Sequence, residues 1–205
     1  MKVTLIQQTE KPIETIAKIA SICYDSDPKD PMKLVKHLYK NGHHSVFEHI
    51  YFTFKIEGIS RACSHQLVRH RQASFTQRSQ RYCSEDGFGY VVPPKVSSEM
   101  GEASRAYFEA VEQIKEGYKK LTELGIPNED ARFLLPNACE TQLYMSCNLR
   151  ELMHIANERL CSRAQWEIRE LVRQMVDLVD PELKFMLVTK CQSGRIICKE
   201  KCEKI

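Results

Sequence analysis

An alternation of apolar and polar residues from Ile50 to Glu57 constrains the fold of this chain more than any other feature. Such a period of two is typical of a β-strand with one buried face. Lys2–Thr9 and Cys139–Cys147 also read as strands. The chain lacks the regular alternation of strands and helices that a doubly wound parallel sheet requires. We therefore expect an α+β fold with about four strands.

Helical spacing of apolar residues predicts most of the remaining elements. Helices are expected from Pro12, from Pro31 to Asn41, from Ser60 to Arg71, from Ser97 or Ser98 to Leu124, from Asn128 to Pro136, from Asn148 to Arg163 and from Ala164 to Val179. The longest of them is expected to bury Ala103, Ala106, Ala110, Ile114, Leu121 and Leu124. Capping-box patterns at Ser45–Glu48 and Asn148–Glu151 predict helix starts. The polar stretch Gln72–Gln80 reads as a loop.

The length of 205 residues predicts one domain, 1–205, in which about 190–205 form a cysteine-containing tail. The longest stretch without a charged residue, Thr141–Leu149, is far shorter than the ~20 apolar residues of a membrane span. The first residues lack the apolar core of a signal peptide. Nine scattered cysteines then indicate reduced thiols, and we expect a cytoplasmic protein.

The charge pattern singles out one segment. Net charge is only +3, yet no acidic residue lies between Glu57 and Glu85, and the five cations in that window are all arginines. Hydroxyls and amides are interleaved with these arginines, and guanidinium forks with short hydroxyl donors are what a phosphate group needs. An exposed basic loop and a nucleic-acid-binding module using segment 69–81 are the alternatives. The modest net charge argues against the second.

A longer motif lies in the same segment. Arg69-His70-Arg71 is followed after seven residues by Ser79-x-Arg81-Tyr82, which resembles the signature of the flavin-dependent thymidylate synthase family. Segments 42–49, 131–136 and 148–169 are similar to other family segments, so the resemblance covers nearly the whole chain up to Pro181. A purely structural homo-oligomer would leave the Arg-His-Arg motif unexplained.

The resemblance implies an enzyme, a methyltransferase in nucleotide biosynthesis. Such an enzyme converts dUMP to dTMP with carbon from 5,10-methylenetetrahydrofolate and electrons from NADPH through bound FAD. It also implies a small, mostly antiparallel sheet and a homotetramer whose active sites are shared between subunits. No nucleic-acid or membrane partner is implied.

The resemblance assigns two sets of site residues. Contacts to dUMP are implied for Gln66, Leu67, Val68, Arg69, Gln77, Arg78, Ser79, Gln80, Arg81, Arg132 and Arg159. Contacts to FAD are implied for Ser45, Arg69, His70, Arg71, Gln77, Asn148, Arg150 and His154. Arg159 is the implied catalytic residue, which stabilises negative charge on the uracil ring. Gln77 often corresponds to an acid in the family, and an amide cannot transfer a proton.

Several residues keep a second interpretation. Arg150 and Arg159 would otherwise be expected to pair with Glu151 or Glu158 on a solvated helix face. Ser79 lacks a neighbouring base, so it reads as a phosphate ligand rather than a nucleophile. The tail thiols Cys191, Cys198 and Cys202 do not have the close pairs of a zinc site, so no metal is expected. We expect the tail to be dispensable for chemistry.

Overall fold

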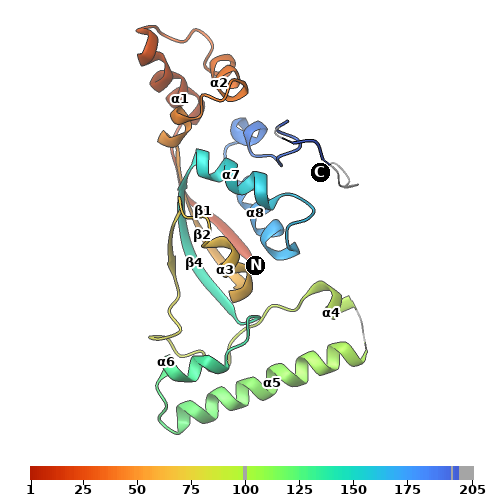
Figure 1. Cartoon of the computed structure of the whole chain (residues 1–205). Helices are drawn as coiled ribbons and strands as arrows, with labels where there is room; N and C mark the ends of the chain where they lie inside the picture. Colours follow the sequence, from red (N-terminus) through yellow and green to blue (C-terminus); the bar gives the residue numbers. More distant parts are fainter. Residues whose placement is uncertain (99–100, 195, 199–205) are drawn as a thin grey trace. The chain divides into compact units, whose positions relative to one another are not determined.

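The computed structural model describes residues 1–98, 101–194 and 196–198 (Figure 1). Its strands are β1 Lys2–Gln8, β2 Tyr51–Ser60, β3 Ser74–Gln77 and β4 Glu140–Asn148. Its α-helices are α1 Pro12–Ser21, α2 Pro31–Lys40, α3 Arg61–Leu67, α4 Pro94–Ser98, α5 Glu102–Glu123, α6 Asn128–Ala131, α7 Leu149–Arg159 and α8 Trp166–Leu178. The short 3-10 helices are η1 Ile22–Tyr24, η2 Ser45–His49, η3 Arg132–Leu134 and η4 Pro181–Met186. The predicted α+β class is confirmed.

The four strands form one small antiparallel sheet in the order β1-β2-β4-β3. Leu149 N donates to Ile50 O at 2.7 Å near one end of the β2–β4 pair, and Arg61 N donates to Cys139 O at 2.9 Å near the other. Both bonds belong to the antiparallel pairing, and the register shifts by one residue between them. The alternation predicted for β2 is also confirmed, because Phe52 is fully buried whereas its neighbour Tyr51 is 58% exposed.

Residue contacts divide the chain into two compact units, which are described separately below. Unit 1 comprises residues 1–2, 56–66 and 76–143, and unit 2 comprises residues 3–55, 67–75 and the chain from residue 144 onward. Each of the four strands therefore has residues in both units. The single-domain boundary 1–205 stays a prediction.

In unit 2, α1 packs against α2, and α7 packs against both α8 and η2. The helix starts follow the predicted caps at two places. The Asp30 side chain accepts from Lys33 N, and the Asn148 side chain accepts from Glu151 N, each at 2.9 Å. Both bonds satisfy backbone donors that the first helical turn leaves unpaired.

The predicted helix start at Ser45 is wrong in kind, since residues 45–49 form the 3-10 helix η2 without a side-chain cap. The helix expected from Ser60 to Arg71 stops at Leu67, and the one expected to reach Arg163 stops at Arg159. In both cases the residue pattern that predicted a helix continues in the sequence beyond the last helical residue.

In unit 1, α5 packs on α4, α6 and η3, above a core cluster of Phe88, Val111 and Cys139. The expectation of one helix from Ser97 or Ser98 is wrong, because α4 and α5 are separate and Gly101 is the N-cap of α5. The predicted buried face is also largely wrong. The stripe that α5 buries is Val111 and Tyr118, whereas these predicted members are exposed: Ala103, Ala106, Ala110 and Leu124.

The expected loop Gln72–Gln80 contains the edge strand β3, which continues into a bond from Arg78 N to Gln142 O at 2.9 Å. Its polar residues are tolerated because an edge strand is covered on few sides. Within the described residues, no helix is both long and apolar enough to cross a membrane.

Candidate functional site

The Arg-His-Arg motif lies in unit 2, in the turn that follows α3. His70 N donates to Leu67 O and Ala73 N donates to His70 O, each at 3.1 Å. This turn points the three side chains in different directions: His70 is only 6% exposed, whereas Arg69 and Arg71 are exposed. The motif thus presents two cations to solvent on either side of a buried imidazole.

His70 is held by residues of α7. Arg159 Nε donates to His70 Nε2 at 3.0 Å. On the other side of the ring, Glu151 Oε1 lies 3.7 Å from His70 Nδ1. The His154 ring approaches edge-on, with ring centroids 5.6 Å apart. Four side chains with titratable or charged groups therefore form one cluster on unit 2.

The imidazole of His70 is neutral in this cluster. Burial, followed by the neighbouring charges of Arg159 and His154, lowers the pKa of His70 from 6.5 to about 4, against a small opposing effect of Glu158. Burial has the opposite effect on an acid, and it raises the pKa of Glu151. A neutral His70 retains the lone pair on Nε2 that accepts the bond from Arg159.

The depressed pKa of His70 predicts an acid-sensitive contribution to stability. Between pH 6.5 and about 4 the unfolded ring binds a proton that the folded ring excludes. The free energy of unfolding should therefore fall as pH drops through this window, by about 3 kcal/mol at its acid end. Urea unfolding of wild type and His70→Gln at several pH values measures this. If the two stability curves stay parallel from pH 7 to 4, His70 does not contribute.

The first half of α7 lines a polar cavity of about 590 Å³, here called the Arg150 cavity. Its lining residues are His44, Glu48, Gln72, Asn148, Arg150, Glu151, Met153 and His154. The structure thus brings together three of the expected FAD contacts, Asn148, Arg150 and His154. The expected contact Ser45 is not in this lining, although it follows His44 directly.

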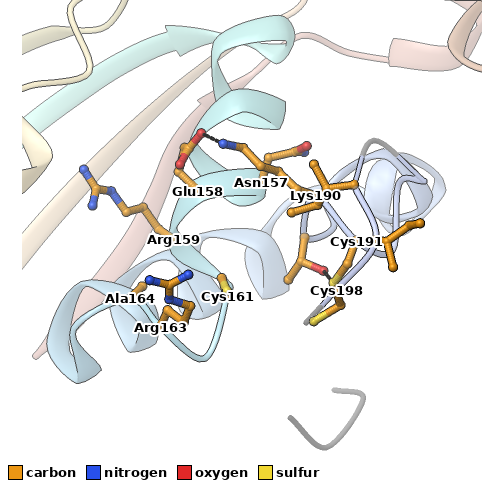
Figure 2. Close-up of a pocket in the computed structure, with 12 residues that line it drawn as sticks. Asn157, Glu158, Arg159, Cys161, Arg163, Ala164, Lys190, Cys191 and Cys198 are labelled. Carbon is orange, nitrogen blue, oxygen red and sulfur yellow. Dashed lines mark hydrogen bonds and ion pairs between the residues drawn. The ribbon is translucent and has the colours of Figure 1, made fainter. Parts of the chain in front are cut away.

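The last turn of α7 lines a second cavity of about 560 Å³, the Arg159 cavity (Figure 2). Figure 2 shows Arg159, Cys161 and Arg163 on one side, with Lys190, Cys191 and Cys198 on the tail side. Asn148 and Arg159 therefore line different cavities. Asn148 is the cap of α7, with extended backbone, and Arg159 is the last residue of the helix.

Arg150 and Arg159 do not pair with Glu151 or Glu158 within α7, which was the alternative interpretation. Arg150 instead pairs with Glu48 of η2, and Glu158 pairs with Lys190 of the tail. Arg159 instead bonds His70. The charged residues of α7 are therefore engaged with other segments of unit 2.

The tail borders the Arg159 cavity through Lys190, Cys191 and residues 196–198, and Cys202 lies outside the described residues. No group of three or more histidines, cysteines or acids able to hold a metal occurs in the parts of the chain described. Truncation after Thr189 should leave flavin bound, because the Arg150 cavity, which contains three of the expected FAD contacts, has no lining residue beyond His154. We expect turnover to remain largely intact as well. Flavin absorbance and dTMP formation measure both; a loss of turnover with flavin retained would show that the tail side of the cavity matters.

The phosphate-binding residues expected from the motif lie in unit 1. Ser79 Oγ accepts from Arg81 N at 3.2 Å and from Tyr82 N at 3.4 Å, and so fixes a tight turn. The Arg81 guanidinium extends to Glu129 at 2.6 Å, in a pair whose two side chains are about half exposed. Because exposed pairs are weak, Arg81 is readily available to an anion.

Arg78 is less available. Its Nε donates to Glu85 Oε1 and its Nη2 donates to Ser84 O, each at 3.1 Å. The hydrogen bond and the charge of Glu85 raise the pKa of Arg78. A direct contact of this side chain with dUMP would require these two bonds to be exchanged, so Arg78 reads as a residue that shapes the loop.

Three further expected contacts differ in how accessible they are to a ligand. Gln77 Nε2 donates to Ser64 Oγ at 3.0 Å and to Thr141 Oγ1 at 3.1 Å, so its amide is fixed within unit 1. Leu67 of unit 2 is fully buried in the core, and the whole residue is 0% exposed. Val68 is 37% exposed.

A third cavity, of about 260 Å³ in unit 1, is called the arginine cavity. It is lined by Arg61, His65, Gln80, Arg132, Phe133, Leu135, Pro136 and Asn137, so no carboxylate faces it. Arg61 Nε is buried and has no hydrogen-bond partner. A buried unpaired donor is costly to the fold. Sequence reasoning counted Arg61 and His65 in the arginine-rich window but assigned them no role.

Comparison with known proteins gives one consistent result. The family described as "Thymidylate synthase complementing protein" matches residues 4–183. The chain is 46% identical over 192 residues to a flavin-dependent thymidylate synthase of Geobacter sulfurreducens, an alignment that covers 87% of this chain and 82% of the relative. It is 40% identical over 191 residues to the protein of that name from Pyrococcus furiosus, with 86% and 78% covered.

A solved structure gives the same indication. A UMP/dUMP methylase, PolB from Streptomyces cacaoi bound with 5-Br dUMP, superposes with a TM-score of 0.75 at 25% identity, and 86% of this chain and 88% of that chain are covered. The nucleic-acid-binding alternative is not supported by these relatives.

Proposed function

This chain belongs to the flavin-dependent thymidylate synthase family, and from that premise we propose how its residues carry out the reaction. The enzyme methylates dUMP to dTMP with FAD as its cofactor. In the proposal, carbon comes from 5,10-methylenetetrahydrofolate and electrons come from NADPH. The chain acts in the cytoplasm as a single domain, in a homotetramer whose active sites draw residues from more than one subunit.

The cluster around Arg159 carries the proposal. A cation sits at the end of α7, bonded to the central histidine of the Arg-His-Arg motif and lining its own cavity. The uracil ring must accumulate negative charge before its C5 attacks an electrophilic carbon. A preorganised guanidinium stabilises such charge strongly when water is excluded. Arg159 is thus the proposed catalytic residue and a dUMP contact.

The Arg150 cavity is the proposed FAD site, because its lining includes donors that FAD needs. The guanidinium of Arg150, the imidazoles of His44 and His154 and the amide of Asn148 all line it. Such groups match a diphosphate and the polar edge of a flavin ring. Arg69, His70 and Arg71 of the adjoining turn, together with Ser45 and Gln77, complete the proposed FAD contacts. When bound, the flavin supplies the hydride.

The phosphate of dUMP is assigned to the arginine-rich part of unit 1. Arg81 and Ser79 of the tight turn are joined by Gln80 and Arg132, which line the arginine cavity. Arg61 also lines that cavity and no carboxylate does, which supports an anion there. Gln66, Leu67, Val68, Arg69, Gln77 and Arg78 stay proposed contacts from the family motif.

The two buried cysteines, Cys139 and Cys147, are not nucleophiles in this mechanism. Burial raises the pKa of Cys139 to about 11 and that of Cys147 to about 12, so neither is a thiolate near neutral pH. Because the thiolate is the nucleophilic form, these buried cysteines are poor candidates for attack on C6 of the uracil. Ser79 is not the proposed nucleophile either, and its Oγ accepts a hydrogen bond from the backbone.

Anaerobic turnover tests the proposed function. Purified protein is mixed with dUMP, methylenetetrahydrofolate, FAD and NADPH, and dTMP is measured with all components and with each omitted in turn. We expect dTMP in the complete mixture and a loss of product on each omission, together with flavin absorbance of the protein. Product without NADPH or without folate would contradict the proposed donors.

A further inference from the structure

We propose that Glu151 and His70 are positioning residues that hold the Arg159 guanidinium in the orientation required for the reaction. The inference rests on the proposed function of Arg159 and goes beyond it. His70 joins the other two side chains: Arg159 Nε donates to Nε2 at 3.0 Å, and Glu151 Oε1 lies 3.7 Å from Nδ1. All three residues belong to unit 2.

The bond from Arg159 fixes the tautomer of His70. Because Nε2 accepts a hydrogen bond, the single proton of the neutral ring is on Nδ1. That N–H faces the Glu151 carboxyl group, which is itself only 6% exposed. Glu151 thereby favours the tautomer whose free lone pair faces Arg159. Buried carboxylates often orient a functional histidine in this way.

Fixing Nε of an arginine fixes the plane of its whole guanidinium. The five donors form a rigid fork, so one anchored N–H leaves the terminal groups aimed in a defined direction. Arg159 also lines the Arg159 cavity. The anchor restrains a flexible side chain before the substrate arrives, and preorganisation of this kind favours the transition state over mere binding.

Burial and the neighbouring charges keep His70 neutral at neutral pH, so that it can accept the bond from Arg159. The titratable and charged groups that face His70 are Arg159, His154 and Glu158 of α7, together with Glu151. Protonated His70 would have no lone pair for Arg159 and would repel it. The pKa of about 4 keeps this state unpopulated at neutral pH.

A matched pair of substitutions tests the anchor. His70→Gln keeps an oxygen acceptor near the position of Nε2, whereas His70→Leu removes the acceptor at similar volume. With flavin bound, His70→Leu should lose about 30-fold or more in kcat with KM for dUMP changed less than about threefold, because transition-state stabilisation is lost rather than binding. His70→Gln should keep clearly more of the wild-type kcat than His70→Leu, because it retains the acceptor for Arg159.

Glu151 provides an independent pair. Glu151→Gln keeps an oxygen acceptor for the Nδ1 proton, whereas Glu151→Leu does not, and we expect a loss of kcat of about tenfold in the second variant alone. This pair decides the matter if circular dichroism shows that His70→Leu does not fold.

The outcomes distinguish the positioning role of His70 and Glu151 from the proposed function of the protein. Equal kcat in the acceptor-keeping and acceptor-free variants would overturn the inference, as would a fall in turnover that only parallels a loss of flavin absorbance. Failure of wild-type protein to form dTMP would instead overturn the proposed function.

Discussion

Replacing Arg159 by lysine should lower kcat for dTMP formation by at least about 100-fold, with KM for dUMP changed by less than about threefold. Lysine keeps the charge but replaces the planar fork by a single ammonium group. It therefore cannot bond the ring of His70 in the same way and also present two parallel donors to the uracil. Interactions made mainly in the transition state affect kcat more than binding.

Steady-state kinetics and dUMP binding measured on the same preparations check this result. Arg173→Lys is a matched control, because Arg173 is an exposed residue of α8 paired with Glu170 and Asp177. It should behave as wild type. Equal losses in kcat and in dUMP affinity for Arg159→Lys would indicate a simple binding role.

Replacing Arg81 by alanine should weaken dUMP binding by about 10- to 150-fold, which corresponds to the loss of about 1.5–3 kcal/mol of charge-assisted hydrogen bonding to phosphate. Flavin binding should survive. The exposed pair with Glu129 contributes little to folding, so the free energy of unfolding should change little. Titration with dUMP and flavin absorbance measure the two effects. Arg105→Ala, on the exposed side of α5, is the control. Normal dUMP binding with loss of FAD would contradict the assignment.

Arg61→Met separates binding from stability more sharply. It removes the buried Nε that has no partner and keeps a side chain of similar length. We expect weaker dUMP binding without a fall in the free energy of unfolding, because an unsatisfied buried donor is removed at the same time. Isothermal titration and urea unfolding on the same variant measure this combination. A loss of stability with unchanged dUMP affinity would assign Arg61 to the fold alone.

The sequence predicted those elements whose one face is buried over several residues. The alternation in β2 and the cap at Asn148 depend on local chemistry, and both are confirmed. β3 was missed because Ser74–Gln77 has too few residues for a period, and its pairing with β4 is a tertiary contact. The buried stripe of α5 was misassigned because alanine spacing does not reveal which side the core occupies.

The candidate site shows the same division. The motif identified His70 and Arg159 as residues of one site but could not show that they bond each other, since 89 positions separate them in the chain. Glu151 was seen only as part of a capping pattern and as an alternative surface partner of Arg150 or Arg159. Arg61 was seen only as one cation among five, because an unpaired buried nitrogen is a property of packing and not of composition.

The join between β4 and α7 has no spacer. Asn148 is both the last residue of the strand and the cap of the helix. The register of the strand with its neighbours therefore determines the rotation of the helix about its own axis. One residue inserted after Asn148 would turn the helix by about 100° and advance it by about 1.5 Å, which would move His154 out of one cavity and Arg159 out of the other. The length of this junction is therefore fixed, because an insertion or a deletion would displace residues of both cavities at once.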